Sequence, residues 1–262
     1  MIMSKDTQQQ RQFRILVVGD ACLDLYFFGS CDRLSPEAPV PVFKKGTIEK
    51  RQGMCLNVAS NLESLGNKVS VDRNRETIRK TRIVDQRSGQ HILRIDEEPE
   101  IKRIDLRKYT VDSMRAYDAL VISDYDKGYI LQGDILDIIQ PARSLGIPIF
   151  VDSKKKDLSK FEDCIIKINE KESKLVTSFP KKYEKIVTIG SEGAVWREKK
   201  YPTLRVSVHD VCGAGDVFLA GLTTRYLETR GDIAASIRFA NKCAAISVSR
   251  FGTCTIKRDD LS

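Results

Sequence analysis

The chain has 262 residues, 41% of them hydrophobic, and is long enough to bury a sizeable core. Its net charge of +8 suits phosphorylated small molecules as well as nucleic acid, so charge alone excludes neither class of partner. No run approaches the roughly 20 apolar residues of a membrane helix, and the start MIMSKDTQQQRQF lacks the apolar core of a signal peptide, so we expect a cytoplasmic protein with no membrane partner.

Cysteines and basic residues point to no further class of protein. The seven cysteines are scattered and never form CxxC, which predicts free thiols rather than disulfides or a zinc site. Basic residues are densest at 73–82 and 154–156, and aromatic residues do not alternate with them as in a single-strand binding groove. We interpret both runs as solvated surface and expect no nucleic-acid partner.

The predicted elements begin with a buried strand at residues 14–19, where the apolar run RILVVG ends in glycine. Residues 26–28 and 40–48 lie on either side of a turn-prone Ser-Pro segment and predict half-exposed strands. Residues 81–96 alternate apolar and polar side chains around Ser88-Gly89 and predict a hairpin. Lid segments at about 22–50 and 80–97 would then pair into a small sheet that stands off the main domain.

From residue 118 the pattern changes to strand, helix, strand, which predicts a βαβ unit. Its parts are residues 119–123, 134–145 and 147–152. Further predicted elements are a strand at 164–168, a short helix from 170, a strand at 185–189, a hairpin near 192–193, and helices at about 213–229 and 233–249. No internal repeat or low-complexity linker is present, so we expect one α/β domain over residues 1–262.

The segment Asp210-Val-Cys-Gly-Ala-Gly-Asp216 carries the strongest chemical signal. Glycines at a helix N-terminus let main-chain N–H groups approach an anion, and the helix dipole favours phosphate charge there. A carboxylate just beyond such a cradle repels phosphate but can take a proton from a hydroxyl that attacks it. Asp216 is therefore a candidate general base; the alternative is a tight turn in which Asp216 caps the helix.

The segment VHDVCGAGDVFLAGL, followed by FANKCAAISVSRFGTCTI, resembles the C-terminal signature of the ribokinase-like (PfkB) carbohydrate kinases. The resemblance implies an α/β three-layer sandwich with a central, mostly parallel sheet and a small β lid, and ATP and Mg²⁺ as cofactors. It assigns the base to Asp216 and the anion hole to Gly213, Ala214 and Gly215. For the nucleotide and metal it implies Asn169 and Glu172, which would organise Mg²⁺ through water, then Thr188, Gly190, Ser191 and Gly193 beside the nucleotide, and Asn241 near the adenine.

The N-terminal half resembles the heptose 7-phosphate kinases within that family. The matching stretches are GDACLD from residue 19, RLSPEAPVPV from 33, KTR from 80 and SDYDKG from 123. The resemblance implies transfer of the ATP γ-phosphate to the C1 hydroxyl of D-glycero-D-manno-heptose 7-phosphate, a precursor of the lipopolysaccharide core. It places Asp24, Gly53, Asn57, Asp124 and Lys127 at the sugar, with Arg33, Lys80 and Arg82 as candidates for its 7-phosphate. A homodimer through the lid is a further expectation.

The sequence departs from the family at two places. Met54 stands where the family usually has glycine, which alone tolerates unusual dihedrals and close contact with a ligand. Residues 72–79 connect two segments that the family separates by a unit comparable to a βαβ crossover of roughly 30 residues. A shortening between about 71 and 79 would expose one side of the sheet. These departures leave open a kinase of ribose, fructose phosphate or a nucleoside, and a degenerate paralogue that binds a ligand without catalysis.

Overall fold

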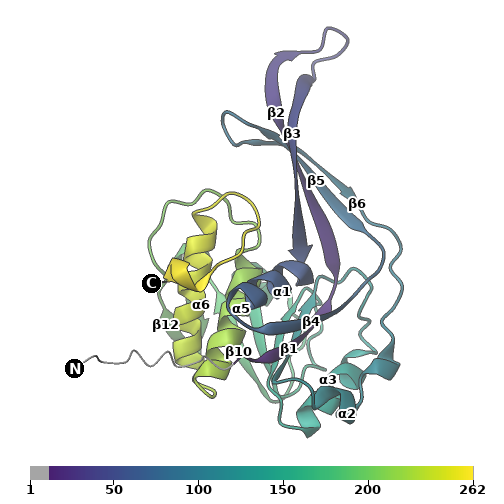
Figure 1. Cartoon of the computed structure of the whole chain (residues 1–262), viewed down its shortest axis with the longest axis vertical. Helices are drawn as coiled ribbons and strands as arrows, with labels where there is room; N and C mark the ends of the chain where they lie inside the picture. Colours follow the sequence, from purple (N-terminus) through teal and green to yellow (C-terminus); the bar gives the residue numbers. More distant parts are fainter. Residues whose placement is uncertain (1–11, 262) are drawn as a thin grey trace, which may run out of the picture.

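Two β-sheets organise the chain, one inside the main body and one in a lid that rises from it (Figure 1). The computed structural model describes residues 12–261. Residues 1–11 and 262 lie outside the described residues. The expectation of no signal peptide falls on residues 1–11, and the predicted domain includes residue 262. Within the described part of the chain, no helix is long and apolar enough to span a membrane.

The main sheet has eight strands in the order β12-β11-β10-β9-β8-β7-β1-β4. Strands β4, β1, β7, β8, β9 and β10 run parallel, while β11 and β12 are antiparallel, so the expected mostly parallel sheet is confirmed. The strands are β1 (Arg14–Gly19), β4 (Lys68–Arg73), β7 (Ala119–Asp124), β8 (Ile149–Ser153), β9 (Cys164–Asn169), β10 (Tyr183–Thr188), β11 (Ala194–Trp196) and β12 (Lys199–Tyr201).

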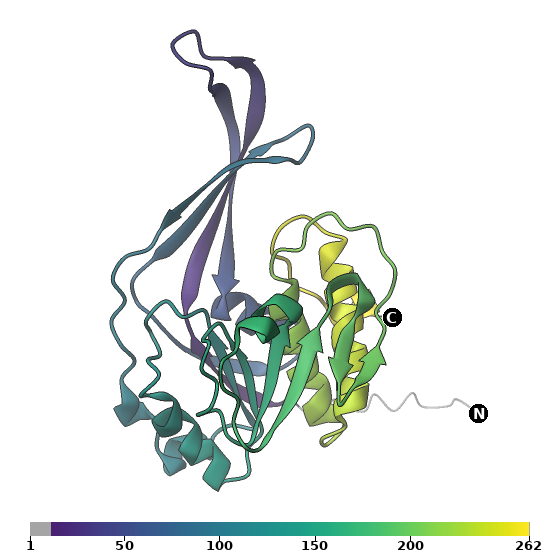
Figure 2. The same ribbon diagram turned by 180° about the vertical axis from the view of Figure 1, so that it is seen from behind.

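Helices cover both faces of this sheet and complete the expected three layers (Figures 1 and 2). One face carries α1 (Cys55–Ser64), α5 (Ala214–Glu228) and α6 (Ile233–Val248), and the other carries α2 (Val111–Met114) and α3 (Ile135–Ser144). The remaining short helices are α4 (Glu170–Leu175), η1 (Leu106–Lys108), η2 (Gly190–Glu192) and η3 (Arg258–Leu261). The predicted long helices near 134–145, 213–229 and 233–249 are therefore confirmed.

Strand β1 shows why its sequence is apolar at every position from Ile15 to Val18. Ile15 and Val17 point into the core that includes α1, α5 and α6, whereas Leu16 and Val18 point into the core that includes α3. Successive side chains of a strand face opposite sides, so a strand covered on both faces needs apolar residues at every position. The predicted buried strand at 14–19 is confirmed.

The lid is a four-stranded sheet in the order β3-β2-β5-β6. Its strands are β2 (Ala21–Leu34), β3 (Pro41–Met54), β5 (Ile78–Asp85) and β6 (His91–Glu97). The hairpin predicted around Ser88-Gly89 joins β5 to β6. Both β2 and β3 extend well beyond the predicted 26–28 and 40–48, because antiparallel pairing from Ala21 opposite Met54 to Leu34 opposite Pro41 satisfies main-chain groups that the alternation of side chains does not reveal.

A four-residue connection leads from the main sheet directly into the lid. Strand β4 forms the edge of the main sheet, and residues 74–77 join it to β5. The buried Asn74 side chain holds this turn: Oδ1 accepts from the N–H of Ala21 at 2.6 Å, and Nδ2 donates to the carbonyl of Glu76 at 2.6 Å. Most of β4 is exposed, so the short connection leaves an open sheet edge.

Met54 sits at the joint between the lid strand β3 and helix α1. Its dihedral angles are φ 58° and ψ −132°, a conformation that glycine adopts readily and other residues rarely adopt. Its side chain is buried against Cys22 and Ile78. The buried thioether therefore compensates for a strained backbone.

Removing the Met54 side chain in two ways separates these effects. We expect Met54→Gly to be more stable than Met54→Ala by about 1 kcal/mol, because both lose the buried side chain but only glycine relieves the backbone. Within a helix or strand, a protein with glycine is ordinarily less stable than the same protein with alanine at that position. Urea unfolding of both variants measures the difference, and a more stable alanine variant would contradict the strain.

Candidate active site

The phosphate cradle is built by the turn into helix α5. Gly213 has φ +75°, and a Cβ there would lie 2.6 Å from Nδ2 of Asn57, so both the dihedral and the space require glycine. The first N–H groups of a helix have no partner within the helix, and the dipole of a 15-residue helix favours an anion at this end. Ala214 and Gly215 line a cavity at this point.

Asp216 lies in the first turn of α5 with only 3% of its surface exposed. Its Oδ2 accepts from Nδ2 of Asn57 at 2.9 Å and its Oδ1 accepts from the hydroxyl of Tyr125 at 2.7 Å. The carboxylate thus bonds to α1 and to the loop after β7 rather than capping its own helix. Burial raises the pKa of Asp216 to about 6, against the opposing effect of the two donors. A carboxylate with this pKa can accept a proton near neutral pH.

Tyr125 is held in place by the end of strand β1. Asp20 is fully buried and accepts from the N–H groups of Tyr125 at 2.8 Å, Lys127 at 3.2 Å and Tyr129 at 3.4 Å. The Tyr125 ring lies 5.7 Å from Nζ of Lys80. Tyr125 was not among the predicted site residues, although its place at the carboxyl end of a parallel strand was a usable signal.

We expect Tyr125→Phe to change the pH dependence of the reaction. The wild-type kcat/KM should fall as pH drops through about 6, because Asp216 must be deprotonated to act as base. The Tyr125 hydroxyl donates to the carboxylate and stabilises its charged form, so its removal should move this acid limb to higher pH. A pH profile of kcat/KM for both proteins measures the shift; coincident limbs would contradict it.

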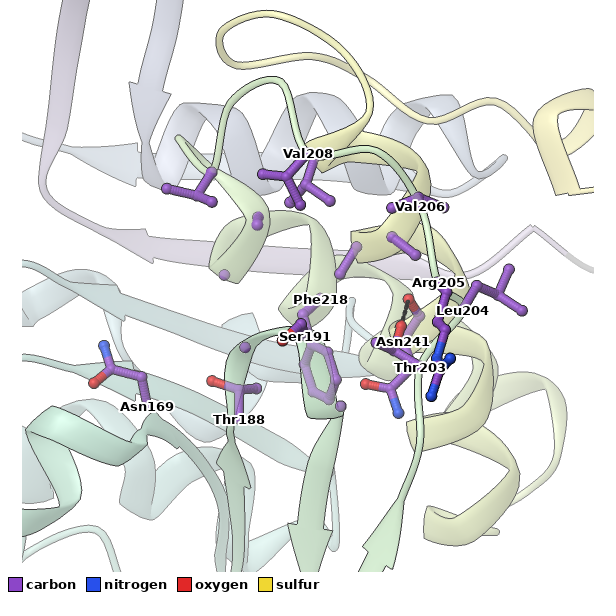
Figure 3. A pocket seen from close by; sticks show the side chains of 18 residues that line it. Asn169, Thr188, Ser191, Thr203, Leu204, Arg205, Val206, Val208, Phe218 and Asn241 are labelled. Carbon is purple, nitrogen blue, oxygen red and sulfur yellow. Dashed lines mark hydrogen bonds between the residues drawn. The ribbon is translucent and has the colours of Figure 1, made fainter.

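A cavity of about 360 Å³ opens beside the cradle (Figure 3). Six of the seven residues predicted at the nucleotide line it, and Glu172 does not; the six are Asn169, Thr188, Gly190, Ser191, Gly193 and Asn241. Asn241 is buried and donates to the carbonyl of Tyr201 at 2.8 Å, which fixes the start of the loop that follows β12.

That loop forms an apolar wall which the sequence analysis missed. Leu204, Val206, Val208 and Val211 line the cavity and are exposed. Exposed apolar side chains around a concave site suit a flat, apolar ligand such as a purine base. The alternation of Leu204, Val206 and Val208 with polar residues was the available signal.

Two cations, the buried Lys167 and the half-buried Lys154, lie behind the cradle. Lys167 pairs with Oδ2 of Asp152 at 2.5 Å, and a Cβ on Gly215 would lie 2.8 Å from Nζ of Lys167. Lys154 bridges Oδ1 of Asp152 at 2.9 Å and Oε1 of Glu172 at 2.6 Å. Although burial opposes it, Lys167 and Lys154 hold the pKa of Asp152 below its usual value. Positive charge close to the cradle favours a phosphate there.

Both basic runs were therefore partly misinterpreted as solvated surface. Lys154 is largely covered, and Lys155 is 8% exposed and pairs with Asp126 at 2.5 Å. In the other run Arg82 is buried, while Arg73, Arg75 and Arg79 are exposed as expected. Lys155 and Arg82 pair with Asp126 and Asp24, which are far away in the sequence, so a local charge count does not contain these partners.

Asn169 and Glu172 form a capping box at the start of α4. Oδ1 of Asn169 accepts from the N–H of Glu172 at 2.8 Å, and Oε2 of Glu172 accepts from the N–H of Asn169 at 2.9 Å. Among the described residues, no group of three His, Cys, Asp or Glu side chains could hold a metal ion. Lys154 and the capping box already engage the Glu172 carboxylate, so it is not free to coordinate a metal ion directly. These residues therefore fit Mg²⁺ that is coordinated mainly by water and phosphate oxygens.

The lid brings part of the predicted sugar site together. Asp24 pairs with Arg82 at 2.5 Å, with their side chains 4% and 9% exposed. A Cβ on Gly53 would lie 2.3 Å from Oδ2 of Asp24, so glycine is required where β3 passes this carboxylate. Asn57, near the start of α1 where the lid strand β3 ends, donates a hydrogen bond to Asp216 and so connects the lid to the candidate base.

Three predicted substrate residues make contacts of other kinds. Arg33 is exposed and lies opposite Val42, near the outer end of the β2–β3 hairpin. Lys127 pairs with Glu98 at 2.6 Å. Asp124 is fully buried, accepts from the Ser153 hydroxyl at 2.7 Å, and has a pKa that burial raises to about 6. Among the described residues, no hydrogen bond or ion pair joins these three side chains to Asp216.

A glycine-lined helix end with a buried carboxylate beside an apolar cavity agrees with one family. The model described as pfkB family carbohydrate kinase matches residues 66–260. The chain belongs to the pfkB family of carbohydrate kinases. It is therefore an ATP-dependent sugar kinase, and its sheet and lid have the ribokinase-like arrangement.

Curated relatives share the name Bifunctional protein HldE. The one from Campylobacter curvus is 32% identical over 300 residues, covering 94% of this chain and 63% of the relative. The one from Haemophilus influenzae is 30% identical over 314 residues, covering 99% and 65%. The chain spans less than two thirds of the length of these relatives. Both matched stretches are longer than its 262 residues, so the relatives contain residues that this chain lacks.

Solved structures share the fold. Phosphofructokinase-2 from Escherichia coli in complex with potassium has a TM-score of 0.74 at 17% identity, covering 95% of this chain and 97% of that one. Ribokinase from Arabidopsis thaliana, complexed with ribose and ATP, has a TM-score of 0.68 at 15% identity, covering 96% and 98%. At these identities the likeness concerns the fold alone.

Proposed function

We propose that this chain is a cytoplasmic kinase that transfers the γ-phosphate of ATP to the C1 hydroxyl of D-glycero-D-manno-heptose 7-phosphate. The position of Asp216 supports the reaction type. Its carboxylate is buried, makes no ion pair with any described residue, and lies one position beyond Gly215. The motifs shared with heptose 7-phosphate kinases and the HldE relatives support the sugar.

In the proposed mechanism Asp216 takes the proton of the C1 hydroxyl as that oxygen attacks the γ-phosphorus in line. The N–H groups at Gly213, Ala214 and Gly215 donate hydrogen bonds that stabilise the negative charge developing on the phosphoryl oxygens. The cavity lined by Thr188, Asn241 and the loop after β12 would hold the nucleotide. Magnesium, placed through water at Asn169 and Glu172, would neutralise phosphate charge. Closure of the lid would exclude water, a competing acceptor.

Lys80 is the cation best placed for the phosphate on the sugar. Three arginines on the inner face of the lid, the face that carries Asp24, have acidic partners: Arg51 with Glu49, Arg82 with Asp24, and Arg94 with Asp96. Lys80 lies on the same face, opposite Asp24 and Asp96 in the strand register, and makes no ion pair with any residue that the structure describes. Its Nζ lies 5.7 Å from the centre of the Tyr125 ring. A dianionic phosphate group is bound by a charged donor that makes no ion pair within the protein.

Substitution of Lys80 tests the substrate class. Wild-type protein with ATP and Mg²⁺ should turn over heptose 7-phosphate in preference to ribose, fructose 6-phosphate and nucleosides. Lys80→Met should raise the KM for heptose 7-phosphate by about 10- to 100-fold, the value of a charged hydrogen bond. Arg79→Met is the matched control, since Arg79 precedes it on the opposite, exposed face and pairs with Glu97.

The outcomes separate the alternatives. Selective turnover of another sugar would replace the heptose proposal with a different carbohydrate kinase. Nucleotide binding without turnover of any sugar in the panel would favour a ligand-binding paralogue. Equal effects of the Lys80 and Arg79 substitutions on KM would remove Lys80 from the sugar site. Salt-sensitive binding to DNA or RNA would reopen the weaker alternative that charge alone suggested.

We further propose that two copies pair through the outer face of the lid. Register places Phe27, Ile83 and Leu93 in one row and Leu25, Thr81 and Ile95 in the next. Leu93 is 53% exposed and Ile95 46% exposed. An apolar sheet face of this kind suits a second, identical face. Sedimentation should give a dimer that Leu93→Asp converts to a monomer, and a monomeric wild type would contradict it.

A further inference from the structure

Arg51 joins the base of the lid to a loop of the main body. It lies on the inner face of β3, three residues before Met54, with its side chain 23% exposed. Its Nη1 donates to the carbonyl of Phe251 at 2.5 Å and to the carbonyl of Thr253 at 3.1 Å. This guanidinium therefore ties the lid to the segment that follows helix α6.

The same segment holds the start of the phosphate cradle. The N–H of Gly252 donates to Oδ2 of Asp210 at 3.0 Å, and Oδ1 of Asp210 accepts from the N–H of Cys212 at 2.9 Å. Gly252 has φ +68°, and a Cβ there would lie 2.1 Å from Nη1 of Arg51. Glycine thus lets Arg51 approach the main chain, and the contacts run from the lid to the residue before Gly213.

Three further contacts restrict how this segment can move. Nδ2 of Asn61 on α1 donates to the carbonyl of Cys254 at 3.1 Å, and Oδ1 of Asn61 accepts from the N–H of Ile256 at 3.0 Å. The Phe251 ring packs against Tyr26 on the lid at 5.9 Å between centroids. The far end of the segment is therefore fixed to α1, while residues 251–253 are held by the lid and by Asp210.

We propose that Arg51 is a positioning residue that couples the position of the lid to the geometry of the phosphate cradle. A sugar that closes the lid moves Arg51, the carbonyls of Phe251 and Thr253 follow, and the hydrogen bonds of Asp210 set the turn at Cys212 and Gly213. The cradle is then complete only when the lid is closed, which limits transfer of phosphate to water. This coupling rests on the proposed function, in which the lid holds the sugar.

Hydrogen exchange tests the coupling without any substrate. In Arg51→Met we expect faster amide exchange in two segments, 250–256 and 209–216, with the strand at 119–124 unchanged. Lys50→Met is the control, because Lys50 is the preceding residue on the exposed face of the same strand. Since coupling is reciprocal, Asp210→Asn should speed exchange at 49–54. Faster exchange confined to 250–256 in Arg51→Met, with no reciprocal effect, would overturn the proposal.

Kinetics give the second readout. We expect Arg51→Met to lower kcat for sugar phosphorylation by about 10-fold, the lower end of the value of one charged hydrogen bond, with KM for ATP little changed. Arg51→Lys should recover part of this loss, since an ammonium can still donate to a carbonyl. A rise in KM for ATP with kcat unchanged would place Arg51 in nucleotide binding instead. If the wild type turns over no sugar, the proposed function fails, and the exchange experiment still decides the coupling.

Discussion

Asp216→Asn is expected to lower kcat by about 10²- to 10⁴-fold, the contribution of a positioned general base. The amide keeps the size of the carboxylate and one oxygen to accept from Asn57 or Tyr125, but it cannot take a proton. Binding of ATP should stay close to the wild-type value, because Asp216 does not line the nucleotide cavity. Steady-state kinetics together with calorimetric titration of nucleotide measure both effects.

The control is Asp232→Asn at the start of the neighbouring helix α6. Asp232 accepts from the N–H of Ala235 at 2.9 Å as a helix cap, a task that asparagine performs equally well. The control should therefore match the wild type in kcat and in melting temperature. Substantial sugar-dependent turnover by Asp216→Asn, at a melting temperature close to that of the control, would falsify the assignment of the base.

Gly213→Ala is expected to lower kcat by about 10²- to 10³-fold, comparable to losing a donor of an anion hole. The added methyl group would lie 2.6 Å from Nδ2 of Asn57 and 3.0 Å from the Thr253 side chain, at a φ of +75° that alanine rarely adopts. The turn must shift, and Asn57 must move away from Asp216. The same substitution therefore disturbs both the cradle and the base.

Gly133→Ala provides the comparison, because a Cβ at Gly133 meets no atom within 4 Å and its φ is ordinary for an L residue. That variant should keep wild-type kcat and gain up to about 1 kcal/mol in stability. Gly213→Ala should lose about 1–3 kcal/mol in urea unfolding, from the strained dihedral. Equal kinetics for the two variants would mean that the main-chain amides at Gly213 do not contact the transferred group.

The candidate active site brings together residues that are far apart in the sequence. Asn57 is 159 residues before Asp216, and Tyr125 is 91 residues before it, yet both donate to its carboxylate. Strand order explains this meeting: β1 lies between β7 and β4, so the loop after β7 and the joint before α1 reach the same end of the sheet. Such a meeting depends on pairing between distant strands, which no local pattern specifies.

Helix α1 shows a second limit of the sequence. Its residues include Asn57 and Asn61, which are buried because they bond to Asp216 and to the segment at 254–256. Polar residues on the buried side weaken the apolar periodicity by which a helix is found. The sequence pattern accordingly predicted no helix there, although the helix carries a residue of the candidate site.

The sequence by itself determined the buried strand at 14–19, the helices α3, α5 and α6, the hairpins, and the placement of Asp216 beyond a glycine-rich helix start, since each depends on neighbours within a few residues. Only the tertiary structure decided which donors meet that carboxylate, that Lys154 and Lys155 are covered, and that Asn74 turns the chain from β4 into the lid. The physical reason is that burial and charge pairing are properties of the assembled sheet, and residues far apart in the chain become neighbours only when the strands have paired.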